Sequence, residues 1–425
     1  MARDEIPLRS HGLLTLEILR LQIHSLGNGV GGVARPSGER AIFVRGALPG
    51  ETVACEVEQE RKSFRVARLL EVLDPSPHRV KPPCPLFPDC GGCSMQHLKY
   101  GIQLEIKHGW VESALRRVFQ GAEVNAVTAS PRVIGYRNRV SFDIVEGRTG
   151  LHRHRGDPIP ADDCLLLGER GRVTTASLAG FDLSFCGRVC VRSSSGQISD
   201  GLEFWGCTDP APLPLSREGA AFETRGVWTA PVGWNLRETL SGISFSVPPG
   251  GFMQVNTEAA EELIRRVVWI AGGSRSVLDL YGGAGTFALP VASTGASVAS
   301  VESNSSSSAA GAETAARNGL GGVEFVAADC RDFLMDAVER ARRWDLVIAD
   351  PPRAGLEAGV CRLVLELAPP RLAYVSCDPQ TLSRDLRILG SAYDPVESIP
   401  FDLFPQTDSV ETVVLLERRK AAGRA

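Results

Sequence analysis

The chain has 425 residues, of which 43% are hydrophobic and 23% are charged. This composition is typical of a folded globular protein large enough for two or three domains, and it excludes a disordered or fibrous chain. The formal net charge of −4 provides no overall basic field that would indicate nucleic-acid binding. Neither a signal-peptide pattern nor an uncharged apolar run of roughly eighteen residues occurs, so we expect a cytoplasmic protein that does not enter a membrane.

The first predicted domain covers residues 16–74 and follows an N-terminal tail, residues 1–15. Short apolar or alternating runs are separated here by glycine-rich and Pro-Gly turns, which is typical of a small antiparallel barrel. We therefore predict an OB-like domain. Four prolines predict a stiff linker over residues 75–83, because proline cannot donate to a sheet ladder and restricts the residue before it.

Three of the eleven cysteines, Cys84, Cys90 and Cys93, stand close together in a loop rich in glycine and proline. Three neighbouring thiols need a fourth ligand. A grouping of three plus one distant thiolate favours an iron–sulfur cluster over zinc, whose sites usually pair two short cysteine knuckles. The candidates for the fourth ligand, which spacing alone does not separate, are Cys164, Cys186, Cys190 and Cys207.

The predicted central domain, residues 84–235, contains this cysteine cluster, a helix from about Leu98 to Phe119, and a less regular stretch rich in Gly, Ser and Arg. Short basic runs at 61–65, 136–139 and 152–155 provide weak support for phosphate contacts, because solvated surface is the more common role of such runs.

The predicted catalytic domain covers residues 236–425. From about Ser276 onward, apolar strands alternate with helical stretches, which predicts an α/β sheet of mostly parallel strands. Such sheets bind their ligands at the carboxyl ends of the strands. Polar residues of interest follow each of these strands, so we expect the active site along that edge.

A glycine-rich turn from Asp279 to Thr286 joins the first of these strands to a helix. Its glycines allow close approach of a ligand to the backbone, although tight packing would also explain them. Glu302 ends the next strand and is placed to accept ribose hydroxyls, and Asp329 follows a further strand near the expected adenine edge. This series suits a nucleoside such as S-adenosylmethionine, but a dinucleotide would share the acid of the second strand.

Three reactive groups follow the later strands: Asp350 stands before two prolines, Cys377 stands before Asp-Pro, and Glu411 directly precedes the last apolar strand. Burial in a core is the usual role of an arbitrary cysteine, but the end of a strand in such a sheet is well placed for chemistry. The set suits methylation of uracil at C5, an atom too weakly nucleophilic to react directly. Addition of Cys377 to C6 would activate C5, Glu411 would remove its proton, and Asp350 would bind the N3/O4 edge of a base splayed out of its stack.

Together these motifs resemble the RNA uracil-C5 methyltransferase family over nearly the whole chain. The resemblance implies a Rossmann-like S-adenosylmethionine-dependent methyltransferase domain, an N-terminal OB-like TRAM domain that binds RNA, and a central region with a 4Fe–4S cluster. By this match, the cluster ligands are Cys84, Cys90, Cys93 and Cys164. Gln254 in the segment Gly251–Asn256 matches a residue that contacts the methionine end of the cofactor.

The same match gives roles to the residues of the sheet edge. Cys377 is the nucleophile and Glu411 the proton acceptor, while Tyr281, Thr286, Glu302, Asp329 and Asp350 occupy cofactor or target-base positions. The chain departs from the family pattern at Gly282-Gly283, where Cys-Gly is common, at Thr286, where Asn is common, and at Asp378, where Asn is usual. A threonine hydroxyl lacks the paired donor and acceptor of an amide, so Thr286 is the least secure of these contacts.

The resemblance implies S-adenosylmethionine-dependent formation of 5-methyluridine in RNA, with 23S ribosomal RNA favoured over uridine 54 of transfer RNA. We expect a monomer without an obligate protein partner. A cytosine-C5 methyltransferase would place its nucleophile in a Pro-Cys context, which differs from Ser376-Cys377. An iron–sulfur RNA-binding protein without catalysis is the alternative from another class, and the retained Cys377 and Glu411 argue against it. The cluster is expected to be structural, because the proposed chemistry transfers no electrons.

Overall fold

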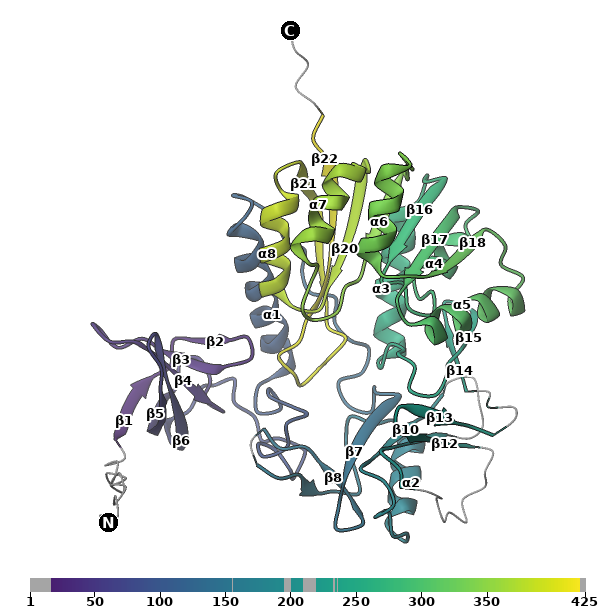
Figure 1. Ribbon diagram of the computed structural model, residues 1–425. Helices are drawn as coiled ribbons and strands as arrows, with labels where there is room; N and C mark the ends of the chain where they lie inside the picture. Colours follow the sequence, from purple (N-terminus) through teal and green to yellow (C-terminus); the bar gives the residue numbers. More distant parts are fainter. Residues whose placement is uncertain are drawn as a thin grey trace, which may run out of the picture. The chain divides into compact units, whose positions relative to one another are not determined.

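The computed structural model describes residues 17–154, 156–194, 200–208, 219–231, 234 and 236–420 (Figure 1). The chain divides into two compact units. The first contains the described residues up to Lys81 together with His97–Lys99, and the second contains Pro82–Gln96 and the chain from Tyr100 onward. None of the helices in the described ranges combines the length and apolar character that crossing a membrane requires.

The first unit is a six-stranded sheet with the strand order β1-β5-β6-β4-β3-β2. Its apolar core includes Ile42, Val44, Val53 and Cys55. Register shifts between β5 and β6 mark bulges, which bend strands as a barrel requires. The barrel-like sheet agrees with the OB-like fold expected for this part of the chain, but β4 and β6 are parallel, so the expectation of a purely antiparallel barrel was wrong. The strands are β1 (Ile18–Gln22), β2 (Ser25–Gly27), β3 (Gly31–Ala34), β4 (Ala41–Arg45), β5 (Thr52–Glu60) and β6 (Phe64–Asp74).

The middle of the chain forms a second sheet, where the sequence indicated only a less regular stretch. The strand order is β13-β12-β11-β10-β7-β8-β9, with helix α2 (Glu169–Leu178) beside it. The apolar pattern of these strands is interrupted in the sequence by charged residues that are buried in the structure. Arg192 and Glu203 lie inside the protein and form an ion pair there. The strands are β7 (Arg139–Val145), β8 (Arg148–Leu151), β9 (Ile159–Pro160), β10 (Arg188–Arg192), β11 (Gly201–Trp205), β12 (Ala220–Thr224) and β13 (Val227–Thr229).

The third sheet confirms the predicted α/β architecture, with the strand order β18-β17-β16-β19-β20-β22-β21. The first five strands in this order are parallel to their neighbours, and β22 runs antiparallel to β20 and β21. The strands are β16 (Ser276–Leu280), β17 (Ser297–Glu302), β18 (Val323–Ala327), β19 (Leu346–Ala349), β20 (Arg371–Ser376), β21 (Tyr393–Phe401) and β22 (Glu411–Arg418). A small hairpin of β14 (Arg237–Leu240) and β15 (Ile243–Ser246) precedes this sheet.

Helices cover both faces of this sheet (Figure 1), because successive apolar residues of each strand point to opposite sides. Val277 belongs to the core beneath one set of helices, and its neighbour Leu278 belongs to the core beneath the other. The first set is α3 (Thr257–Ala271), α4 (Ala288–Ala292) and α5 (Ser305–Arg317). The second set is α1 (Tyr100–Arg116), α6 (Cys330–Glu339), α7 (Ala358–Leu367) and α8 (Pro379–Leu389).

Candidate active site and cysteine-lined cavity

The carboxyl ends of the five parallel strands meet at one edge of the sheet, and β22 begins at the same edge. The strand order changes direction between β16 and β19, so the chain leaves these two strands on opposite sides. A crevice at such a switch point is the usual ligand site of an open α/β sheet. The predicted polar residues are therefore brought to the expected edge.

Cys377 follows β20 directly, and Glu411 is the first residue of β22. The antiparallel ladder between these strands pairs Ser376 with Thr412. Cys377, which follows Ser376, and Glu411, which precedes Thr412, therefore lie at adjoining positions next to that pair. Burial raises the pKa of the Cys377 thiol to about 12, the Glu411 charge adds to this rise, and the Arg353 guanidinium opposes it. The thiol must therefore lose its proton before it can act as a nucleophile.

Asp350 follows β19, and its backbone N–H donates to the Leu280 carbonyl of β16 at 3.3 Å. Burial raises the pKa of both Asp350 and Glu411; the Asp350 charge raises that of Glu411 further, whereas Arg353 lowers it. Arg353 was given no role by sequence reasoning. Its guanidinium donates to the Ser409 hydroxyl at 3.2 Å, which holds a cation beside the reactive groups. In the sequence, only the position of Arg353, three residues after Asp350, indicated that it could lie near the reactive groups.

The glycine-rich turn after β16 is tightly built. A side chain at Gly282 would collide with Ser300 and with the buried carboxylate of Asp279. Burial, with the Asp350 charge second, raises the pKa of Asp279 to about 8. The backbone of Tyr281, a predicted cofactor residue, has a φ of 61°, a left-handed conformation that is uncommon for a residue with a side chain.

The two acids expected to bind a nucleoside have backbone partners. Glu302 accepts from the N–H of Gly283 at 3.1 Å, so its carboxylate lies against the glycine-rich turn. Asp329 caps α6 and accepts from the N–H groups of Arg331 and Asp332. Thr286 lies in the same turn, directly before Phe287, the N-cap of α4.

Gln254 is buried and lies in a segment held by the central sheet. Asn138 donates its side-chain amide to the Gln254 carbonyl at 3.0 Å and its backbone N–H to the Val255 carbonyl at 2.8 Å. Asn256 caps α3, so the same segment also begins a helix of the catalytic domain. Sequence reasoning did not single out Asn138.

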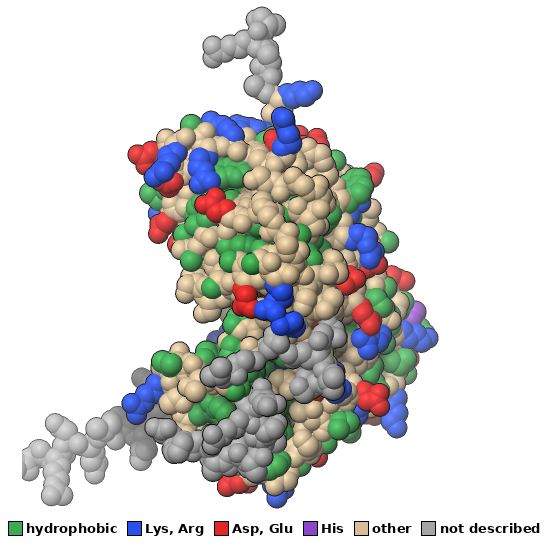
Figure 2. Space-filling view, turned by 90° about the vertical axis from the view of Figure 1, so that its right-hand side faces the viewer, with side chains coloured by type: hydrophobic (Ala, Val, Ile, Leu, Met, Phe, Trp, Pro, Cys, Tyr) green, Lys and Arg blue, Asp and Glu red, His purple; other side chains and the backbone are tan. Residues whose placement is uncertain are grey.

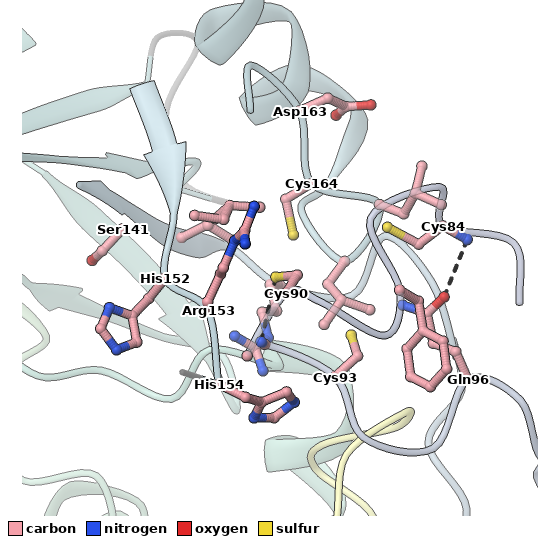
Figure 3. A pocket seen from close by; sticks show the side chains of 18 of the residues that line it. Cys84, Cys90, Cys93, Gln96, Ser141, His152, Arg153, His154, Asp163 and Cys164 are labelled. Atoms are coloured by element: carbon pink, nitrogen blue, oxygen red, sulfur yellow. Dashed lines mark hydrogen bonds between the residues drawn. The ribbon is translucent and has the colours of Figure 1, made fainter. Parts of the chain in front are cut away.

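The four cysteines matched to a cluster line one cavity of about 620 Å³ (Figure 3). Gly91 donates its backbone N–H to the His152 carbonyl at 2.8 Å, and a side chain at Gly91 would meet this same stretch of backbone. Gly92 donates to the Cys90 sulfur at 3.4 Å, and the Cys84 N–H donates to Gln96 at 3.2 Å. The cysteines are Cys84, Cys90, Cys93 and Cys164.

The structure separates the four candidates for the fourth thiol. Cys164 lines the cavity, whereas Cys186 and Cys207 lie in the apolar core of the central sheet. Cys190 accepts a hydrogen bond from Arg139 at 2.9 Å. Across the described ranges, no three His, Cys, Asp or Glu side chains form a group that could hold a metal ion.

Comparisons with known proteins agree on one family. A family model described as tRNA (uracil-5-)-methyltransferase matches residues 239–419. An RNA methyltransferase of Gloeobacter violaceus is 32% identical, with 97% of this chain and 99% of the relative covered. A 23S rRNA (uracil(1939)-C(5))-methyltransferase of Marinomonas is 30% identical, with 95% of this chain and 96% of the relative covered.

Among solved structures, the chain is similar to the tRNA (uracil-54, C5)-methyltransferase of Pyrococcus abyssi in complex with S-adenosyl-L-homocysteine. The TM-score is 0.76 at 27% identity, and 94% of this chain and 100% of that chain are covered. The near-complete coverage includes the central region and the catalytic sheet. The chain therefore belongs to the RNA uracil-C5 methyltransferase family.

Proposed function

We propose that this protein methylates C5 of a uridine in RNA through a covalent bond between the Cys377 sulfur and C6 of the base. The observation that carries this proposal is the placement of Cys377 and Glu411 at adjoining positions on paired strands, with Asp350 at the end of the next parallel strand. These are a nucleophile, a base and a group that can hydrogen-bond the uracil edge.

The reaction divides into addition, methyl transfer and elimination. The Cys377 thiolate adds to C6 and moves negative charge toward C5 and O4. C5 then takes the methyl group of S-adenosylmethionine, whose bond between sulfur and the methyl group breaks to leave S-adenosyl-L-homocysteine. Glu411 accepts the C5 proton, the double bond between C5 and C6 re-forms, and the bond between sulfur and C6 breaks to release Cys377 as a thiolate. Arg353 favours the charged forms of both Cys377 and Glu411, which are the forms that react.

The methyl donor is proposed to bind along the glycine-rich turn. Support comes from the position of this turn at the carboxyl end of β16, beside the point where the strand order changes direction, and from the S-adenosyl-L-homocysteine in the Pyrococcus abyssi structure. The residues proposed to contact it are Gln254, Tyr281, Thr286, Glu302 and Asp329, with Asp350 facing the donor or the target base.

The proposed substrate is 23S ribosomal RNA, because the Marinomonas relative with this name matches almost the full length of the chain. Transfer RNA is the second candidate, because the Pyrococcus abyssi neighbour acts on it. Incubation of the full chain with labelled donor and each RNA, followed by mapping of the modified base, separates the two. Absence of methyl transfer to any RNA would refute the proposed function.

The cysteine-lined cavity is proposed to hold a 4Fe–4S cluster. The support for this proposal is that all four cysteines line one cavity, and a 4Fe–4S cluster takes four thiolates, although among the described residues these side chains do not form a metal-binding group. The Gly92 N–H already points at the Cys90 sulfur, as groups that stabilise cluster thiolates do. We expect a brown protein that contains iron and sulfide when it is purified without oxygen. A colourless protein with stoichiometric zinc would contradict this assignment.

A further inference from the structure

The loop between β21 and β22, residues 402–410, is largely buried. Loops usually lie at the surface because water satisfies their backbone groups. We call this segment the hairpin loop. It begins after Phe401 and ends before Glu411, and these two residues pair across the ladder.

Four consecutive carbonyl groups of the hairpin loop accept hydrogen bonds from four separate segments of the chain. The Leu403 carbonyl faces the segment of the predicted cofactor residue Gln254, and the Gln406 carbonyl faces the chain that follows Cys93. In acceptor order, the donors are Asn256 Nδ2 (3.0 Å), Lys107 Nζ (3.0 Å), Tyr136 Oη (3.1 Å), and the N–H groups of Ser94 and Met95 (both 3.0 Å). The loop thus joins the cysteine-lined region to the catalytic edge.

Gln103 and Lys107, one turn apart on α1, hold this loop from within the protein. Both side chains are fully buried. Gln103 donates to the Met95 carbonyl and to the Gln406 side chain, each at 3.0 Å, and accepts from the Gln406 N–H at 3.1 Å. Gln406 has a φ of 69°, a conformation that a non-glycine residue keeps only when its surroundings impose it.

Lys107 holds the start of the loop. Its ammonium group donates to Asp402 Oδ1 at 2.6 Å, and both side chains are fully buried. Burial of a charged side chain is costly unless it is paired, and Lys107 and Asp402 supply each other with the opposite charge. At the other end of the loop, the Ser409 hydroxyl accepts from Arg353, the cation beside Cys377 and Glu411.

We propose that Gln103 and Lys107 are positioning residues for methyl transfer, because they hold the hairpin loop that orients Arg353 and Glu411 beside Cys377. The inference rests on the proposed function for its catalytic part. Its structural part, that α1 fixes the hairpin loop against the chain after Cys93, stands on the contacts alone.

The first experiment needs neither RNA nor donor. Gln103→Leu keeps a similar size and removes the three hydrogen bonds, and Val111→Ala, a buried apolar change on the same helix, is the matched control. Hydrogen-exchange mass spectrometry should show peptides over residues 402–411 exchanging about tenfold faster in Gln103→Leu than in the wild type or the control. Unchanged exchange would overturn the inference, whatever the protein does to RNA.

The second experiment measures the catalytic consequence. In Gln103→Leu, kcat should fall by about tenfold or more, while KM for the donor stays within about threefold. The double variant Lys107→Met/Asp402→Asn removes both buried charges together and should show the same split without leaving one charge unpaired. Wild-type kcat in both would overturn the proposal, and a wild-type protein without methyl transfer would instead refute the proposed function.

Discussion

The reactivity of Cys377 depends on the charges around it. Burial is the largest cause of the raised pKa of the thiol; the charges of Glu411 and, more weakly, Asp350 and Asp378 raise it further, whereas Arg353 lowers it. A negatively charged carboxylate beside a cysteine disfavours the thiolate form of that cysteine. The position of Glu411 next to Cys377 therefore needs an explanation other than activation of the thiol. Removal of the C5 proton supplies that explanation, because a carboxylate whose pKa is raised toward the working pH is a stronger base once it has lost its own proton.

The covalent step predicts different outcomes for the two central residues. Cys377→Ala should abolish methyl transfer, because C5 would no longer be activated. Glu411→Gln should still add to C6 but should accumulate a protein–RNA adduct that survives denaturing electrophoresis. Cys361→Ala, which removes a buried thiol of α7, is the control and should keep near-normal activity. Normal turnover by Cys377→Ala would exclude covalent catalysis.

The pH dependence of the reaction should report on Arg353. Both Cys377 and Glu411 act in their deprotonated forms, so kcat/KM should rise with pH until both have lost their protons. Arg353 lowers the pKa of each, and Arg353→Gln should therefore move this rise to higher pH. Arg353→Lys keeps the charge and should move it less. A profile that Arg353→Gln leaves in place would show that the guanidinium does not act on these groups.

At the level of elements, Asp329 is the N-cap of α6 and is also a proposed contact of the methyl donor. Its carboxylate caps α6, and its position after β18 suits a contact with the donor. Asp329→Ala should lower the free energy of unfolding by about 1 kcal/mol through loss of the cap. Asp329→Ser should restore the cap and the stability.

The affinity for S-adenosylhomocysteine, measured by calorimetry, distinguishes the capping role of Asp329 from the proposed contact with the donor. If Asp329 contacts the donor, both variants should bind it more weakly than the wild type. Wild-type affinity in Asp329→Ser would leave capping as the role of this residue.

The sequence predicted the elements whose apolar pattern is regular. Strands such as β19 and β20 are apolar on both faces, and the helices between them follow the usual period, so the α/β sheet and its active edge could be inferred. The central sheet could not, because its buried Arg192 and Glu203 resemble surface residues in a sequence. Arg353, Asn138 and the hairpin loop were missed for a related reason: their roles depend on contacts between distant segments.

At the scale of the molecule, the formal net charge of −4 does not by itself indicate a surface that binds RNA. Figure 2 shows Lys and Arg side chains scattered among acidic ones on one face of the protein, consistent with the net charge of −4. Recognition of RNA by a splayed base and by shape is compatible with such a surface.

The cysteine-lined cavity leads to a prediction about the iron content and the stability of the whole protein. Cys164→Ser should reduce iron bound per chain and lower the melting temperature, because the cavity joins the chain around Cys84–Cys93 to the central sheet. Cys186→Ser, in the apolar core, should retain iron and controls for a general loss of stability. Equal iron content in the two variants would mean that Cys164 is not the fourth ligand.

The position of β22 has a consequence for chains that lack it. This strand comes last among the described elements, yet it lies between β20 and β21, so the edge strand β21 has its ladder partner only when β22 is present. Without β22, Cys377 lacks Glu411, the proposed proton acceptor, beside it, and we predict that such a chain cannot complete the proposed reaction. Proteins truncated before Glu411 should keep the strands of the donor-binding edge and remain unable to release a methylated product.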